Sequence, residues 1–76
     1  MIITGKQVKE ARKLLGWSQL KLAQKSNVTD GKIMSCESGE ALLTPAAADA
    51  VRRALEGGGV EFASDIWPNV RLRKST

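Results

Sequence analysis

Histidine is absent from the 76-residue chain, and cysteine occurs once, at Cys36. A zinc finger needs four Cys or His ligands and a Ser-His-Asp triad needs a histidine base, so both kinds of site are excluded. A single cysteine cannot close a disulfide within the chain, which excludes a disulfide-stabilised secreted scaffold. No Gly-rich phosphate loop or metal-ligand set is present either, so we expect no enzyme activity, no cofactor and no metal.

The sequence also lacks long apolar runs. No stretch approaches the roughly 18 apolar residues of a membrane span, and no signal peptide is visible, so we expect a cytoplasmic, nucleoid-associated protein. Hydrophobic residues make up 42% of the chain, too many for a disordered polymer with net charge +4. That charge favours an acidic partner such as nucleic acid or an anionic membrane, although it can also serve solubility alone.

Four segments begin with one pattern, in which an apolar residue precedes Ser or Thr and a second apolar residue follows at the fourth helical position. The hydroxyl residues of this pattern can cap helices, and they are Thr4, Ser18, Thr29 and Thr44. The pattern predicts helices over about 4–15, 18–26, 29–38 and 45–56. Glycines at the ends of the first, third and fourth segments fit helix termination.

Apolar residues recur at helical spacing within these segments and predict one buried stripe on each helix. The expected core positions are Val8, Ala11, Leu15, Leu22, Ala23, Ile33, Cys36, Ala48, Val51 and Leu55. Cys36 is expected to be a small buried hydrophobe, because its neighbour at i−3 is Ile33. Between the second and third helices, Asn27 suits a left-handed turn position. We therefore predict a mainly α fold with four helices.

The C-terminal part alternates with period two over 60–63 and 70–73, around the turn-forming segment 64–69. This pattern predicts a small β-hairpin, which must pack on the helices or pair with a second chain because a lone hairpin is marginal in water. We favour pairing, with a dimerisation element formed by Phe62, Trp67, Val70 and Leu72. The expected division is a helical domain at 1–57, able to fold alone, and a tail at 58–76.

Residues 17–39 outline two capped helices joined by a tight turn, as in a helix-turn-helix. The residues that carry a more specific likeness are Arg12, Gly16-Trp17-Ser18-Gln19, Leu22-Ala23, Val28-Thr29, Ile33 and Glu37-Ser38-Gly39. In this order and spacing they resemble the Cro/C1-type (XRE family) helix-turn-helix regulators over about residues 4–56. The ending resembles a small bacterial subgroup with a C-terminal strand pair. The resemblance implies a lambda-repressor-like DNA-binding domain.

The resemblance also implies roles for individual residues. Arg12 and Glu37 match a structural pair in which the first helix orients the third. The positions that match DNA contacts to phosphates or base edges are Ser18, Gln19, Thr29, Asp30, Gly31, Lys32 and Ser35.

This chain departs from the family pattern at several of these positions. Asp30 can accept from a cytosine amino group or favour the helix dipole, and we prefer the dipole role. Gly31 offers no side chain, so direct base readout would rest on Lys32, Ser35 and Gln19, with DNA shape supplying part of the specificity.

These features predict a transcriptional repressor that binds double-stranded DNA as a homodimer on an inverted repeat. The alternative is an antitoxin or anti-activator that acts mainly through contact with another protein. Arg52 and Arg53 are open to two interpretations, as solubility charges or as phosphate contacts.

Overall fold

The computed structural model describes residues 3–62 and 70–72. These residues form the helices α1 (Gly5–Leu15), α2 (Gln19–Ser26), α3 (Asp30–Ser38) and α4 (Pro45–Gly57), followed by the strands β1 (Val60–Phe62) and β2 (Val70–Leu72). The predicted mainly helical domain is confirmed, as is an antiparallel strand pair after it. The segment 63–69, which includes the expected turn and Trp67, lies outside the described residues. No helix within the described part of the chain is long and apolar enough to cross a bilayer.

The sequence predicts the start of α1 correctly, because both partners of its cap are local. Thr4 Oγ1 accepts from the Gln7 amide at 3.1 Å, and Gln7 Oε1 accepts from the Thr4 amide at 2.9 Å. Gly16 then ends the helix in the left-handed conformation, with φ of 68°. Ser18 caps α2 and Thr44 caps α4 through the same kind of bond, so three of the four predicted hydroxyl caps are confirmed.

The cap of α3 is different. Thr29 occupies the N-cap position with an extended backbone, but its hydroxyl forms no capping hydrogen bond. Instead, Asp30 Oδ1 accepts from the Gly31 amide at 2.9 Å. The prediction of a Thr29 hydroxyl cap is therefore wrong, because a carboxylate in the first turn supplies the acceptor. A negative charge at this end of the helix also suits its dipole.

The turn between α2 and α3 is held by its own residues. Asn27 adopts the predicted left-handed conformation, with φ of 60°. The buried Ser26 donates from Oγ to the Leu22 carbonyl at 2.7 Å and accepts from the Val28 amide at 3.4 Å. These two hydrogen bonds tie the last turn of α2 to the reversal that starts α3.

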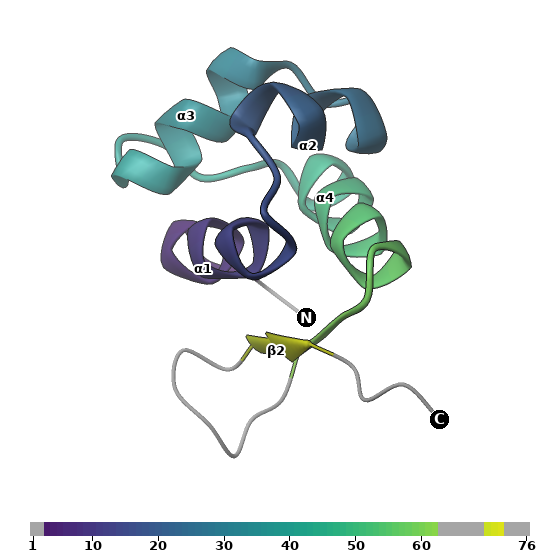
Figure 1. Cartoon of the computed structure of the whole chain (residues 1–76). Coiled ribbons are helices and arrows are strands. Elements are labelled where there is room, and N and C mark those ends of the chain that lie inside the picture. The colour runs from purple at the N-terminus through teal and green to yellow at the C-terminus, as the bar shows by residue number, and fades with distance from the viewer. Residues whose placement is uncertain (1–2, 63–69, 73–76) are drawn as a thin grey trace.

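The core lies where all four helices and β1 meet. In Figure 1, α1 and α4 lie between the α2–α3 pair and the strands. The largest fully buried side chains are Leu22, Ile33, Leu55, Val8, Val51 and Val60. Phe62 packs against this core. Of the two arrangements considered for the hairpin, this contact corresponds to packing on the chain's own helices. The helices share this core with β1, through Val60.

Candidate nucleic-acid interface

The helix α3 buries one side and exposes the other. Ile33 and Cys36 face the core, which confirms the predicted burial of the cysteine. The outward side carries four of the residues predicted to contact DNA, namely Asp30, Gly31, Lys32 and Ser35. Ser35 is partly exposed and the other three are exposed, so a partner can reach all four from solvent.

Gly31 occupies a helical position where a side chain would fit. Apart from the neighbouring backbone of its own helix, no atom lies within 4 Å of the place that its Cβ would take. The fold therefore does not require glycine here, although glycine weakens a helix. Its effect is to leave the first turn of α3 open to close approach by another molecule.

A three-residue polar network fixes the other end of α3. The Arg12 guanidinium donates to both Glu37 oxygens at 2.9 Å and to the Trp17 carbonyl, also at 2.9 Å. Gln19 Nε2 donates to Glu37 Oε1 at 3.2 Å. The hydrogen bond to Glu37 raises the pKa of Arg12, although burial opposes the shift. The pair implied by the resemblance is present and joins α1 to α3, and Gln19 connects α2 to it.

Burial makes this network a strong positional restraint. The side chains of Arg12 and Glu37 are only 14% and 4% exposed. A two-pronged guanidinium–carboxylate pair has a fixed geometry, so it restricts rotation of α3 against α1. Gln19 remains partly exposed and has a second amide hydrogen, which is available to a bound molecule. The hydroxyl of Ser18 at the adjoining cap position is exposed too.

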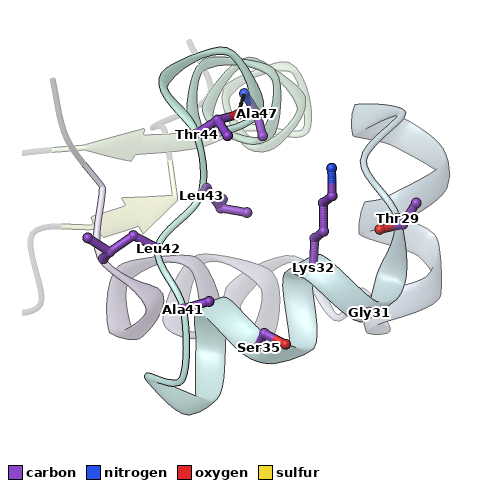
Figure 2. Close-up of a pocket in the computed structure, with 9 residues that line it drawn as sticks. All are labelled: Thr29, Gly31, Lys32, Ser35, Ala41, Leu42, Leu43, Thr44 and Ala47. Carbon is purple, nitrogen blue, oxygen red and sulfur yellow. Dashed lines mark hydrogen bonds between the residues drawn. The ribbon is translucent and has the colours of Figure 1, made fainter.

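A groove of about 500 Å³ runs beside α3, and it was not among the sites expected from the sequence. It lies between the first turns of α3, the loop at 41–44 and the start of α4, and Figure 2 shows the nine residues around it. Lys32 reaches into this space from α3, opposite Leu43. Leu42, on the loop, is 87% exposed. Helical periodicity does not predict the path of a loop, and the apolar run at 41–43 is the sequence feature that could have pointed to this surface.

The arginines of α4 are engaged along their own helix. Arg52 donates to Asp49 at 2.7 Å and to Glu56 at 2.9 Å, and Arg53 lies 2.9 Å from Asp49. The hydrogen bond from Arg52 lowers the pKa of the Asp49 carboxyl. The i,i+3 and i,i+4 spacings of these residues in the sequence indicate such pairs. The structure therefore favours paired surface charges over arginines free to bind phosphate.

Of the residues proposed for dimerisation, Leu72 is half exposed and Phe62 is partly buried. Val70 pairs with Phe62 in the strand register, and Trp67 lies outside the described residues. Within residues 3–62 and 70–72, no three His, Cys, Asp or Glu side chains gather as a metal site requires. No protein-family model matches this chain, and no curated protein matches it either.

Proposed function

We propose that this chain is a sequence-specific double-stranded DNA-binding transcriptional regulator of the Cro/C1 type, with a lambda-repressor-like helix-turn-helix. The observation that carries the proposal is the α2–turn–α3 unit, whose second helix exposes a polar face while the Arg12–Glu37 pair holds its orientation. An α-helix presented in this way fits the major groove, which is about 12 Å wide. The likeness of residues 4–56 to that family supports the same assignment.

The exposed residues suit two kinds of DNA contact. Ser18 and Thr29 stand at the N-terminal ends of α2 and α3, where free amides and the helix dipole favour phosphate oxygens. Lys32 and Ser35 offer donors to base edges from the outward side of α3. Gly31 has no side chain, and the Asp30 carboxylate accepts a hydrogen bond at the N-terminal end of α3. Few side chains are therefore left to contact base edges, and DNA shape contributes to specificity.

Homodimerisation supplies the second half of the recognition. One short helix with few base-reading side chains gives limited specificity, whereas two copies on an inverted repeat double the contacts. In this arrangement the two α3 helices enter major grooves about 34 Å apart, one turn of DNA. A dimer seated on a promoter blocks transcription, so the proposed role is that of a repressor.

Gel retardation with a duplex selected from a randomised inverted-repeat library tests the proposal. Lys32→Ala is expected to weaken specific binding about tenfold. It should also reduce, by about one, the slope of the logarithm of the binding constant against the logarithm of the salt concentration. Gln19→Ala is expected to weaken binding as well. Lys25→Ala is the matched control, because Lys25 lies against the C-terminal end of α4. If Lys32→Ala and Gln19→Ala both bind the duplex as the wild type does, with unchanged circular dichroism, the assignment of α3 as the recognition helix is wrong.

A protein-binding role, as an antitoxin or anti-activator, is the second candidate. The observation that favours it is the exposure of two large apolar side chains, Met34 on α3 and Leu42 on the loop that follows. Large exposed apolar side chains are more typical of protein interfaces than of phosphate contacts. A chain with this role alone would show no salt-dependent retardation of any duplex.

A further inference from the structure

The groove beside α3 combines an apolar wall with a single charge. Its apolar lining comes mainly from the loop and the start of α4, at Ala41, Leu42, Leu43 and Ala47. Among the described residues, Lys32 is the only charged one that lines it. Leu42 is largely exposed, so its side chain gives up the hydrophobic stabilisation that burial of a leucine would supply.

The groove is formed before any partner arrives, because the loop is tied down along its length. The Ser35 carbonyl accepts from the Glu40 and Ala41 amides at 2.9 and 3.2 Å. The Leu43 backbone hydrogen-bonds the Cys36 thiol, and Thr44 caps α4. Binding into a preformed site loses little conformational entropy, so even a short segment can bind here.

Two groups in the groove are free to bind a partner. Lys32 makes no ion pair with any residue in the described part of the chain, and the Thr29 hydroxyl is not used as a helix cap. The ammonium group favours a carboxylate, and the hydroxyl can donate to the same acceptor or to a backbone carbonyl. The neighbouring wall favours an aliphatic or aromatic side chain.

We propose that this groove docks a segment of another protein in which a large apolar side chain lies next to Asp or Glu. A volume of about 500 Å³ is of the size that holds small ligands or a few side chains. A second copy of this chain suits the groove poorly, because each copy carries a net charge of +4. A DNA phosphate suits it poorly too, because most of the lining offers methyl groups rather than donors.

Occupation of the groove has a regulatory consequence, which rests on the proposed function. Thr29, Lys32 and Ser35 belong both to the groove and to the proposed DNA-contacting face. A bound acidic segment would cover these residues and neutralise Lys32, so it would exclude DNA. The partner would thus relieve repression by direct competition.

The test is a titration of the ¹⁵N-labelled full chain with three synthetic peptides, followed by amide NMR shifts in the absence of DNA. The first peptide alternates Asp or Glu with Leu, the second replaces its acids by Lys, and the third replaces its Leu by Ser. Only the first is expected to shift Lys32, Leu43 and Ala47. Equal binding of the lysine peptide, or shifts confined to another surface, would overturn the proposal.

Paired variants sharpen the result. Leu42→Ser is expected to weaken binding of the acidic–aliphatic peptide roughly fivefold to tenfold, whereas Leu20→Ser, at another exposed leucine, leaves it unchanged. Lys32→Glu is expected to reverse the preference toward the lysine peptide, and Lys25→Glu is its charge-matched control. If the groove amides respond to an operator duplex but to none of the peptides, the groove belongs to the DNA interface and the proposal fails. Loss of DNA retardation alone would instead count against the proposed function.

Discussion

Gly5 and Gly31 lie in helices, but the fold needs only one of them. At Gly5 a Cβ would overlap the Cys36 carbonyl oxygen, whereas at Gly31 it would meet open space. Gly5→Ala should therefore lower the free energy of unfolding by about 2 kcal/mol, because α1 must move away from α3. Gly31→Ala should raise it by about 0.5–1 kcal/mol through helix propensity. Urea denaturation followed by circular dichroism measures both.

The same Gly31→Ala protein separates stability from binding. We expect its affinity for a specific duplex to fall, since the added methyl group lies on the face proposed to approach DNA. A variant that is more stable and binds as tightly as the wild type would show that close backbone approach at Gly31 plays no part.

Cys36 makes the folding stability of the chain depend on pH in the alkaline range. Burial raises the pKa of its thiol above the ordinary value of 9.0, Glu37 adds to the shift, and the Leu43 backbone opposes it. The unfolded chain therefore loses this proton at lower pH than the folded chain does. The stability contributed by the protonated thiol is complete below pH 9.0 and is lost as pH rises through the folded-state pKa.

We expect the difference in urea midpoint between the wild type and Cys36→Ala to shrink from about pH 8 to about pH 10. Lysines titrate in both proteins, so the comparison cancels their effect. A difference that stays constant over this range would mean that the buried thiol does not titrate in either state.

At the scale of elements, the Arg12–Glu37 pair couples α1 to α3. Glu37→Ala leaves the guanidinium largely buried with only the Trp17 carbonyl, so we expect a loss of about 3 kcal/mol in the free energy of unfolding. Glu40→Ala is the matched control, since Glu40 is exposed just after α3. Replacing the whole pair, as Arg12→Met with Glu37→Leu, should recover part of the loss. Urea denaturation that shows equal effects for Glu37→Ala and Glu40→Ala would contradict this.

The bounds of the elements followed from the sequence where the interactions that set them are local. Thr4 with Gln7, Gly16 and Asn27 each act within a few residues, so their patterns predicted the caps and the turn. The Thr29 cap failed because the neighbouring Asp30 supplies the acceptor, and residue type alone does not decide that competition.

Contacts between elements were harder to foresee. The Gly5–Cys36 approach depends on how α1 crosses α3, which no local pattern encodes. The Arg12–Glu37 pair was expected only from the family resemblance, because 25 residues separate its members. The groove was missed for the same reason, since the path of the 41–44 loop depends on bonds to α3.

At the scale of the whole molecule, the helices and the strand pair form one small core. Val60 is fully buried, and β1 contacts α4 while β2 contacts α1 (Figure 1). Removing the tail after Gly59 would delete a core side chain, and burial of such a side chain contributes about 2 kcal/mol. Truncation therefore confuses folding with dimerisation, and a surface substitution on the strands is the better probe.

Leu72 offers such a position, since it pairs with Val60 in the register yet is 50% exposed. We expect Leu72→Asp to shift the proposed homodimer toward monomer in sedimentation equilibrium, because two carboxylates would have to be buried in the interface. Leu20→Asp places the same charge on an exposed leucine of α2 and should leave the dimer intact. Circular dichroism checks that both variants keep their helices.

Because a monomer holds one half-site at a time, Leu72→Asp should also weaken binding to an inverted repeat far more than to a single half-site. If the wild type sediments as a monomer, or if both variants behave alike, the strand pair is not the dimerisation element.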